Sequence, residues 1–435
     1  MNSLYKVNGL NDFFMDFGLE RIEALMNFAG NPQNKLKIIH VAGTNGKGST
    51  CRFLYYILKE HGLKTGLYTS PHLDNFNERI IVGEDTISDS DVARLSSFFD
   101  EITNKENIFK NIGKPTFFEL TTAICFKYFF EKKVEVAVIE TGLGGRLDAT
   151  NIIKKPLVSV ITNISADHKD ILGNSLKKIA LEKAGIIKKN SIAVCGEKNK
   201  KIRQIIQYYA LGVNSLFFSS DTVKLIKKSF FFEYKGLNID IKNIKNPNFA
   251  LYQNDNLKLA VLAAEIISKY YSKALKFNLN EGLLKSAVLK FKNEGRFEII
   301  KYKNNDIILD GAHNPDGIKK LIASLKKIFP NNNFVTIFAV MKDKDYNMIL
   351  KRLSTLGGKI IFTGLRNNER ALKIKELKKI SLDNKYFKDI FLSSGIKESL
   401  ETALKIKSAD DIILICGSLY LIGEFKKLTK GSINK

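Results

Sequence analysis

Apolar and polar residues alternate along the chain in a pattern typical of strands followed by helices. "LKIIHVAG" (36–43) predicts a buried strand, and "KGSTCRFLYYILKEHG" (47–62) predicts a helix that Gly62 caps. "TGLYTS", "EVAVIET", "LVSVITNI" and "SIAVCG" predict further strands, and "TFFELTTAICFKYFFEKK" and "SLKKIALEKAGIIKK" predict helices. Strands that alternate with helices indicate a parallel sheet covered on both faces.

The pattern changes in residues 216–245, which open with "LFFSS". There "VKLIKKSFFFEYKGLNIDIKNI" alternates and turns at "YKGLN", which predicts an antiparallel hairpin. "NLKLAVLAAEIISKYY" predicts a helix, and "FKNEGRFEIIKYKNND" reads as a linker, after which β/α alternation resumes at "IILDGAHN". We therefore predict an α/β protein with two domains, 1–294 and 295–435.

Composition narrows the class of protein. The net charge of +24 is compatible with nucleic acid, a membrane surface or acidic small substrates, but the lysines are spread over the chain. That distribution favours a solvated basic surface and no nucleic-acid partner. The four cysteines lie far apart and predict neither a disulfide framework nor a zinc site, only small buried side chains. No apolar run is long enough to span a membrane, and the early acidic residues Asp12 and Asp16 do not resemble a secretion signal, so we expect a cytoplasmic protein.

The stretch "VAGTNGKGST" (41–50) lies between a predicted strand and a predicted helix, where a phosphate-binding loop belongs. Its spacing is shorter than that of the Walker A pattern, since only Thr44 and Asn45 separate Gly43 from Gly46. Small residues let backbone N–H groups approach phosphate oxygens, and the helix N-terminus adds positive potential. Lys47 is placed to reach the β and γ phosphates. The loop by itself predicts a nucleotide but no reaction.

Two further strand ends carry polar residues. Glu140 ends the strand in "VIETGLGGRLDATN" (138–151), and a carboxylate at a strand tip beside a nucleotide is a natural Mg²⁺ ligand. A strand end followed by a Gly-rich turn is the plainer alternative. His168 follows the next strand in "NISADHKDILG"; because Mg²⁺ prefers oxygen, a capping role and a ligand role are equally compatible with its chemistry.

Two more positions stay open on residue chemistry alone. Lys183, in "ALEKAGIIKK", lies on a predicted helix among many ordinary surface lysines. Asp310 ends the strand of "ILDGAHN", and with His313 and Asn314 it either contacts a nucleotide or caps the next helix.

Taken in order, the motifs resemble a family. "GLERIEALMNFAGNPQNKLKIIHVAGTNGKGS", "TSPHLDNFNERI", "TFFEL", "ETGLGGRLDATN", "DHKDILG", "EKAGIIK", "GRFE" and "LDGAHNPDG" are similar to folylpolyglutamate synthase/dihydrofolate synthase, within the Mur ligase superfamily. The resemblance is dense from about residue 15 to 320 and looser through "DKD" and "CGSLYLIGE". "GRFE" lacks the aromatic-Pro pair often seen before it, and Thr141 stands where Val is common.

The resemblance implies an ATP-dependent carboxylate–amine ligase with a P-loop parallel-sheet domain and a smaller Rossmann-like C-terminal domain that binds glutamate. It implies that L-glutamate is added to dihydropteroate, to the γ-carboxyl of tetrahydrofolates, or to both, through an acyl phosphate. It also implies roles for residues. The ATP-contacting set is Gly43, Thr44, Asn45, Gly46, Lys47, Gly48, Ser49, Asn256, Arg296, Asp310 and His313. The Mg²⁺ set is Ser70, Glu140, His168 and Lys183, with Lys183 carbamylated for a second ion, and the pterin set is Phe118, Glu119, Leu147, Asp148 and Ala149.

Lys47, Glu140, His168 and Lys183 are the residues expected to carry the reaction. Two other functions compete with this one. A Mur-type ligase acting on a cell-wall precursor is disfavoured by "GLGGRLDATN" and "DHKDILG". A basic P-loop protein that binds nucleic acid would need a clustered basic groove, which the sequence does not indicate. We expect a monomer that acts on small molecules only.

Overall fold

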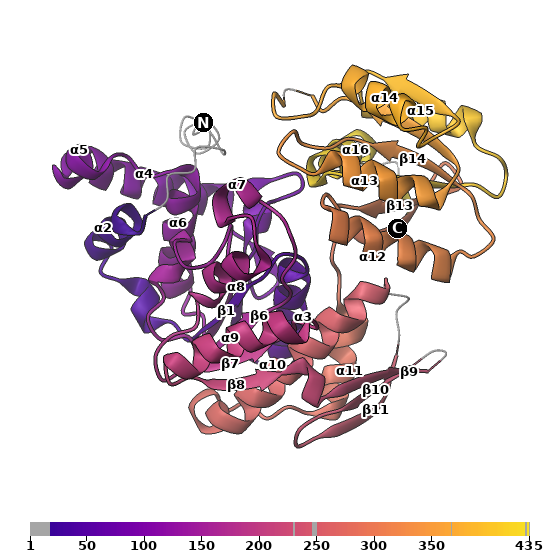
Figure 1. Cartoon of the computed structure of the whole chain (residues 1–435). Helices are drawn as coiled ribbons and strands as arrows, with labels where there is room; N and C mark the ends of the chain where they lie inside the picture. Colours follow the sequence, from indigo (N-terminus) through magenta and orange to yellow (C-terminus); the bar gives the residue numbers. More distant parts are fainter. Residues whose placement is uncertain (1–17, 229–230, 246–249, 367, 431–432, 435) are drawn as a thin grey trace. The chain divides into compact units, whose positions relative to one another are not determined.

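The computed structural model describes residues 18–228, 231–245, 250–366, 368–430 and 433–434 (Figure 1). These residues form two units, each described here by itself. The first holds the described residues up to 245 together with Asn254–Phe291, and the second holds 250–253 and the chain from Lys292 onward. Asp12 and Asp16, on which the expectation about a secretion signal rests, lie outside the described residues.

The first unit is built on an eight-stranded sheet with strand order β4-β3-β2-β5-β1-β6-β7-β8. Six strands run parallel: β1 Ile38–Ala42, β2 Thr65–Tyr68, β5 Val136–Glu140, β6 Val158–Ile161, β7 Ile192–Cys195 and β8 Leu216–Ser219. Antiparallel β3 Ile80–Val82 and β4 Asp85–Thr86 complete one edge. Every residue of β1, β2, β5, β6 and β7 is buried, as the continuous apolar runs predict.

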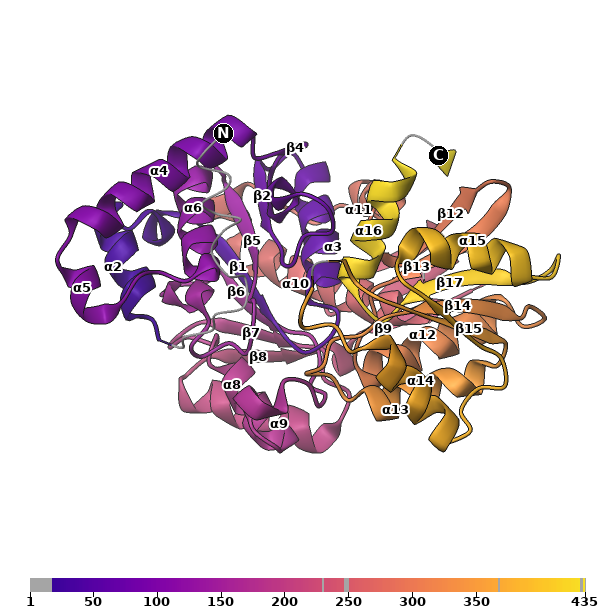
Figure 2. The same cartoon turned by 90° about the horizontal axis from the view of Figure 1, so that it is seen from above.

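Helices cover both faces of this sheet (Figures 1 and 2). Their bounds are α2 Glu20–Phe28, α3 Lys47–Glu60, α4 Asp89–Lys105, α5 Ile108–Ile112, α6 Phe117–Glu131, α7 Lys169–Leu172, α8 Leu176–Ala184, α9 Lys200–Gly212, α10 Leu251–Leu275 and α11 Glu281–Lys290. The 3₁₀ turns are η1 Pro32–Lys35, η2 Phe76–Arg79, η3 Ala149–Ile152 and η4 Ser220–Thr222. Helices α2, α4 and α6 share a core with Ile38 and Ile139, whereas α3 packs against α11.

A separate three-stranded antiparallel sheet, ordered β11-β10-β9, belongs to the same unit. Its strands are β9 Lys224–Lys227, β10 Phe231–Lys235 and β11 Asp240–Lys245. The predicted turn at "YKGLN" joins β10 to β11. The segment "LFFSS" differs from our grouping, because β8 pairs in parallel with β7 at the edge of the main sheet.

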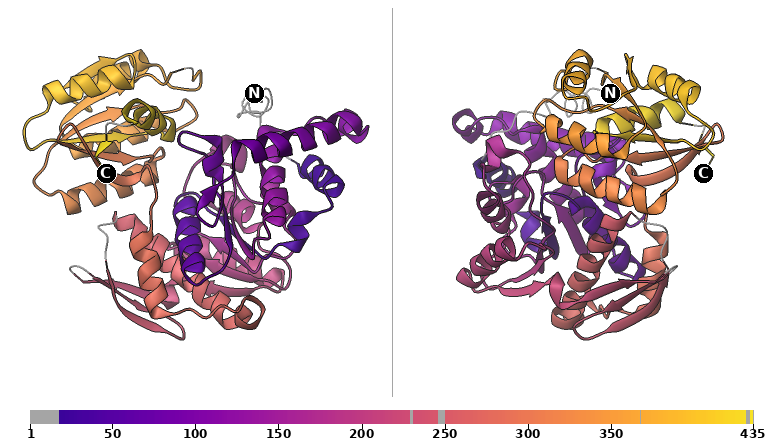
Figure 3. Two further views of the ribbon diagram at one scale, coloured as in Figure 1. Left: turned by 180° about the vertical axis from the view of Figure 1, so that it is seen from behind. Right: turned by 45° about the vertical axis from the view of Figure 1, so that its right-hand side comes forward.

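The second unit is a seven-stranded sheet, ordered β16-β15-β14-β17-β13-β12-β18, flanked by helices (Figure 3). Its strands are β12 Arg296–Tyr302, β13 Asn305–Asp310, β14 Phe334–Phe338, β15 Lys359–Thr363, β16 Ile390–Ser393, β17 Ile412–Cys416 and β18 Ile433–Asn434. Its helices are α12 Pro315–Ile328, α13 Tyr346–Leu353, η5 Ser354–Leu356, α14 Ile374–Asp383, α15 Ile396–Ile406 and α16 Leu419–Thr429. Five strands are parallel, which confirms the predicted α/β class.

One prediction in this region was wrong. The segment read as a linker contains β12, which pairs antiparallel with β13. Three residues of β12, Arg296, Phe297 and Glu298, fall in "GRFE"; the rest alternates exposed and half-buried positions, which a linker also shows. Throughout the described ranges, no helix combines the length and the apolar character needed to cross a membrane. All four cysteines are buried and free, as predicted.

Candidate active site

The phosphate-loop candidate leaves the carboxyl end of β1 and starts α3 at Lys47. Gly46 is the N-cap residue in the left-handed conformation (φ 83°), where a side chain would be strained and would also meet Asn256. The loop is fixed from the side by the segment after β6. Thr44 N donates to Asn163 O (2.8 Å), and Asn45 N donates to Asn163 Oδ1 (2.8 Å). The first N–H groups of α3 are thereby presented at the sheet edge, as anion binding requires.

Side chains in and behind this loop take defined positions. Lys47 Nζ donates to Thr44 O at 3.4 Å, so the lysine side chain folds back over the loop. Ser49, on the first turn of α3, is buried. Gly43 lies against Thr162, whose hydroxyl donates to Asn45 O at 2.7 Å. A β-carbon at Gly43 would collide with the Thr162 side chain, so this position has room only for glycine.

Glu140 is brought to the loop by the strand order, because β5 lies directly beside β1. Its side chain is buried, and Oε2 accepts from Ser70 N at 3.2 Å. A β-carbon placed on Gly48 would lie 3.2 Å from the same oxygen. Ser70 and Glu140, which were predicted together, therefore meet beside the first turn of α3.

Lys183 lies on α8 and is buried, which excludes the reading as an ordinary surface lysine. Its Nζ donates to Gly43 O at 2.8 Å, so the amine lies directly behind the phosphate loop. Burial, and next the positive charge of Lys47, lower the pKa of Lys183 to about 7. A substantial fraction of this amine is neutral near neutral pH and is therefore nucleophilic.

His168 precedes α7 in the left-handed conformation (φ 49°), and its Nε2 lies 3.8 Å from Asp167 Oδ1. In the described part of the chain, no three His, Cys, Asp or Glu side chains converge on a metal position. The predicted Mg²⁺ set includes only two residues of those types, Glu140 and His168. Ser70, Glu140 and the neighbouring loop do fit a hard cation, since they offer oxygen donors beside the place where phosphates would lie.

The other predicted ATP contacts divide between the units. Asn256 lies on α10 within the first unit and faces Gly46. Arg296, Asp310 and His313 lie in the second unit, where Arg296 and Asp310 are partners across β12 and β13. Asp310 is buried at the end of β13 and accepts from Tyr252 Oη at 2.5 Å; burial raises the pKa of its carboxyl. His313 Nδ1 lies 2.8 Å from Gly311 O, just before α12.

Three of the predicted pterin residues, Leu147, Asp148 and Ala149, belong to a second Gly-rich loop, 141–149, which follows β5. Gly142 lies on the ring of Phe118, with no room for a β-carbon, which would come within 2.5 Å of the ring. Leu147 is half-buried and Ala149 is buried at the start of η3. Gly145 packs on the backbone of Lys183, again without space for a side chain. The loop thus lies between Phe118 and the Lys183 helix.

Asp148 closes this loop from inside. Its Oδ2 accepts from Leu143 N at 2.8 Å, and its Oδ1 accepts from Thr150 N at 3.1 Å and from Thr150 Oγ1 at 2.5 Å. Burial raises the pKa of Asp148, while the hydrogen bonds from Thr150 and Leu143 oppose that shift. His40, on β1, lies behind this arrangement with Nε2 2.8 Å from Thr150 Oγ1.

Glu119, also predicted as a pterin contact, is buried and already paired. Its carboxylate accepts from Arg21 Nε at 3.0 and 3.2 Å and from Thr116 N at 2.7 Å, where Thr116 and Glu119 form the capping box of α6. The arrangement makes Glu119 an anchor that joins α2 to α6.

Several residues that shape the site were not singled out from the sequence. Arg21, His40, Asn163 and Thr162 all contribute hydrogen bonds to predicted site residues or their loops. His40 offered a signal, because it is a polar residue inside the apolar run "KIIHVA". Arg21 offered one too, as a charge within "RIEALM". Thr162 and Asn163 follow β6 in an ordinary polar turn and gave no signal.

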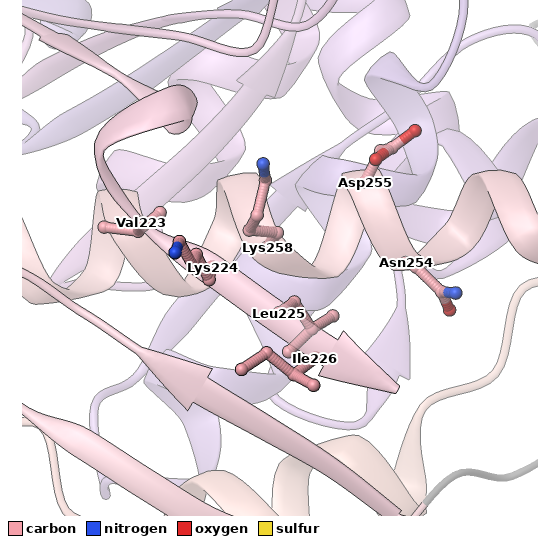
Figure 4. A pocket seen from close by; sticks show the side chains of 7 residues that line it. All are labelled: Val223, Lys224, Leu225, Ile226, Asn254, Asp255 and Lys258. Atoms are coloured by element: carbon pink, nitrogen blue, oxygen red, sulfur yellow. The ribbon is translucent and has the colours of Figure 1, made fainter. Parts of the chain in front are cut away.

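A cavity of about 330 Å³ lies elsewhere in the first unit, between β9 and the first turns of α10 (Figure 4). It is lined by Val223, Lys224, Leu225, Ile226, Asn254, Asp255 and Lys258. None of these residues belongs to the predicted site. We therefore place the chemistry at the strand ends and not in this cavity.

Comparisons with known proteins show what this chain is similar to along most of its length. Residues 41–251 match the Mur ligase middle domain, and residues 295–419 match the Mur ligase glutamate ligase domain. A dihydrofolate synthase/folylpolyglutamate synthase of Bacillus subtilis is 34% identical over 98% of this chain and 97% of its own. The solved Mycobacterium tuberculosis folylpolyglutamate synthase complexed with ADP superposes with a TM-score of 0.90 at 27% identity, covering 99% of this chain and 98% of that one. E. coli FolC in complex with DHPP and ADP gives 0.87 at 25% identity, covering 99% and 97%.

Proposed function

Because this chain belongs to the dihydrofolate synthase/folylpolyglutamate synthase family of Mur ligases, we propose that it joins L-glutamate to dihydropteroate, to reduced folates, or to both. The reaction would convert ATP to ADP and phosphate. The cell-wall alternative is not favoured, since the relatives that match over nearly the whole chain carry folate-ligase names.

The observation that carries this proposal is the set of side chains around the phosphate loop. Glu140 lies against Gly48, the Lys183 amine bonds the Gly43 carbonyl, and Asn256 faces Gly46. A carboxylate, a buried amine and an amide thus meet at one loop within a single unit. The loop that bears the predicted pterin contacts follows the strand that ends at Glu140. Nucleotide and acceptor would therefore bind at adjacent strand ends.

The proposed reaction steps follow from the low reactivity of the acceptor carboxylate. A carboxylate is a poor electrophile, so its oxygen would first attack the γ-phosphorus of ATP, giving an acyl phosphate and ADP. In-line transfer of this kind depends on positioning and charge neutralisation, which the α3 N-terminus and Lys47 would supply. The glutamate amine would then attack the acyl carbon, and phosphate would leave.

The proposal includes two Mg²⁺ ions. Ser70, Glu140 and His168 would hold one, and Lys183, once carbamylated, would offer oxygen ligands to the second. When bound, such ions neutralise charge on the phosphates and on the tetrahedral intermediate. The position of Lys183 supports carbamylation, because its amine is buried beside Gly43 with a pKa of about 7 and is therefore partly neutral. Its carbamate would carry the negative charge that Lys47 can balance.

Residues 295–435 would form the glutamate-binding domain, and Arg296, Asp310 and His313 of that domain stay predicted nucleotide contacts. The match of 295–419 to the glutamate ligase domain supports this assignment. Within the first unit, Phe118, Leu147 and Ala149 would contact the pterin directly, while Glu119 and Asp148 would support that surface. The cytoplasmic location and the monomeric state expected from the sequence remain predictions.

The deciding experiment measures phosphate release from ATP and L-glutamate with dihydropteroate, and separately with a reduced folate. Release with either acceptor, dependent on glutamate, is the expected result. The same assay with a muramyl-type nucleotide precursor serves as the control for the cell-wall alternative. Absence of release with both folate acceptors, in protein whose circular dichroism shows a folded chain, would exclude the proposed function.

A further inference from the structure

We propose that His40 is a positioning residue for the acceptor substrate, acting through Thr150 and Asp148 on the Gly-rich loop 141–149. This inference rests on the proposed function, because it takes that loop as part of the pterin-binding surface. His40 itself contacts none of the residues predicted to bind ATP, metal or pterin in the described hydrogen bonds; its side chain reaches only Thr150.

The location of His40 is unusual for a polar side chain. It is the middle residue of β1, with no exposed surface, between Ile139 of β5 and Ser159 of β6. Burial, and next the charge of Lys188, lower the pKa of His40 to about 3, so the imidazole stays neutral at any working pH. A polar group buried this deeply is retained at a free-energy penalty unless its hydrogen bonds repay the lost hydration.

The direction of the hydrogen bonds can be assigned. The Thr150 hydroxyl carries one hydrogen, which it donates to Asp148 Oδ1 at 2.5 Å. Its 2.8 Å contact with His40 Nε2 must therefore be one in which the imidazole N–H donates. His40 Nδ1 is then the unprotonated nitrogen, and it has no hydrogen-bond partner among the described residues. The histidine is thus held as the Nε2–H tautomer by one bond.

That bond acts on the loop through Asp148. Donation from His40 orients the Thr150 hydroxyl toward Asp148, which leaves Asp148 Oδ2 free to accept from Leu143 N across the loop. The closed loop places Gly142 on the Phe118 ring and Gly145 on the Lys183 backbone. Without the His40 donor, the hydroxyl loses its acceptor role and the Asp148 carboxylate gains rotational freedom. The expected consequence is a less defined surface at Phe118.

The hydrogen bonds from His40 through Thr150 to Asp148 form a relay. The test replaces His40 and Thr150, the first two residues of this relay, in the full-length chain. His40→Leu removes the donor at similar volume, Thr150→Val removes the hydroxyl, and His40→Gln keeps an N–H donor at the position of Nε2. We expect the first two to raise KM and Kd for dihydropteroate about tenfold, with KM for ATP unchanged. His40→Gln should stay within about threefold of the wild type. The double variant His40→Leu/Thr150→Val should bind dihydropteroate no more weakly than Thr150→Val alone, because both changes break the same chain of hydrogen bonds.

A matched control is available on the neighbouring strand. Ser159 is also fully buried and is the register partner of His40, but its hydroxyl donates to Ile186 O and not to Thr150 or Asp148. Ser159→Ala should lower the unfolding midpoint without changing KM for dihydropteroate. An independent readout is the ¹⁵N spectrum of the imidazole, which should show the Nε2–H tautomer across pH 6 to 9.

The outcomes separate cleanly. Unchanged dihydropteroate KM and Kd in both His40→Leu and Thr150→Val would overturn the inference, as would an equal rise in Ser159→Ala. If His40→Leu fails to fold, the KM and Kd of Thr150→Val and His40→Gln for dihydropteroate test the inference instead. A wild-type chain that turns over neither dihydropteroate nor a reduced folate defeats the proposed function instead. In that case the ¹⁵N spectrum still tests the relay. A His40 tautomer other than Nε2–H would overturn the relay, and the Nε2–H tautomer would support it as part of the fold.

Discussion

Two Gly-rich loops leave neighbouring strands of the same sheet, and they are stabilised in opposite ways. The phosphate loop after β1 is held from outside, by Thr162 and Asn163 of the segment after β6. The loop after β5 is held from inside, by Asp148 bonding Leu143 and Thr150. The first thus keeps its helix N-terminus for a ligand, whereas the second has its polar groups engaged before any ligand arrives. We therefore expect the second loop to offer a ligand a shaped surface, because its carboxylate, Asp148, is already hydrogen-bonded.

The same difference explains the glycines. Gly46 needs a positive φ and closeness to Asn256 so that the backbone itself can face an anion. Gly142 and Gly145 need only the absence of a side chain, because Phe118 and the α8 backbone occupy that space. Gly46 thus uses the conformational freedom of glycine, whereas Gly142 and Gly145 use its small size. The following predictions test that distinction.

The largest effect should come from removing charge at the phosphate loop. Lys47→Ala and Glu140→Ala should each lower kcat by at least about 10²–10³-fold, since each removes a group proposed to act on the transferring phosphoryl group or its ion. Phosphate release under saturating substrates measures this. Lys59→Ala, at a half-buried position near the far end of α3 and paired with Glu84, is the matched control and should keep full turnover. Near-normal rates in either site variant would refute the assigned role.

Substitution of the glycines should separate the two loops. Gly46→Ala should weaken ATP binding strongly, because its β-carbon is strained and meets Asn256. Gly142→Ala should instead raise KM for dihydropteroate by about tenfold or more while ATP affinity holds, because the β-carbon displaces Phe118. Gly212→Ala, where no atom lies within 4 Å, is the control. An equal loss of ATP binding in Gly46→Ala and Gly142→Ala would contradict the proposed difference between the two loops.

Lys183 tests the point where the two loops meet. Lys183→Ala should lower turnover, and added acetate or formate should restore part of it by supplying the missing carboxylate oxygens. In the wild type, a pKa of about 7 means that the amine is mostly protonated at pH 6 and mostly neutral at pH 8. Carbamylation needs the neutral amine, so activity at fixed bicarbonate should rise across that interval. A variant with full activity, or one that no carboxylate restores, would contradict the carbamate.

The smallest effect is the contribution of His40 to the free energy of unfolding of the chain. The pKa of His40 is about 3 in the folded chain and near 6.5 when unfolded, so protons bind preferentially to the unfolded chain below pH 6.5. The free energy of unfolding should therefore fall as the pH is lowered from 6.5 towards 3, by at most about 1.4 kcal/mol per pH unit from this group. The midpoints of urea unfolding of the wild type and of His40→Gln, measured at pH 7 and pH 5, isolate the contribution of His40 to this pH dependence. A difference between the two proteins that does not change with pH would exclude this contribution.

Much of the fold could be read from apolar runs, because strands buried on both faces need continuous Ile, Val and Leu. β1, β5, β6 and β17 are such strands, and each was predicted. β12 was missed, since it lies near an edge of the sheet. Two of its residues are exposed and four are half-buried, so its pattern resembles a polar connection. β8 was placed in the wrong group, because "LFFSS" does not reveal whether its partner is parallel or antiparallel.

The sequence by itself determined the class of protein, the two Gly-rich loops and the family, since each depends on residue types in a fixed local order. Only the tertiary structure decided what the polar side chains do. It buried Lys183 against Gly43, paired Glu119 with Arg21, and connected His40 to Asp148 through Thr150. These pairs are separated by up to 140 positions in the chain. Burial and hydrogen bonding set the pKa and orientation of a side chain, and both depend on neighbours that only the folded sheet brings together.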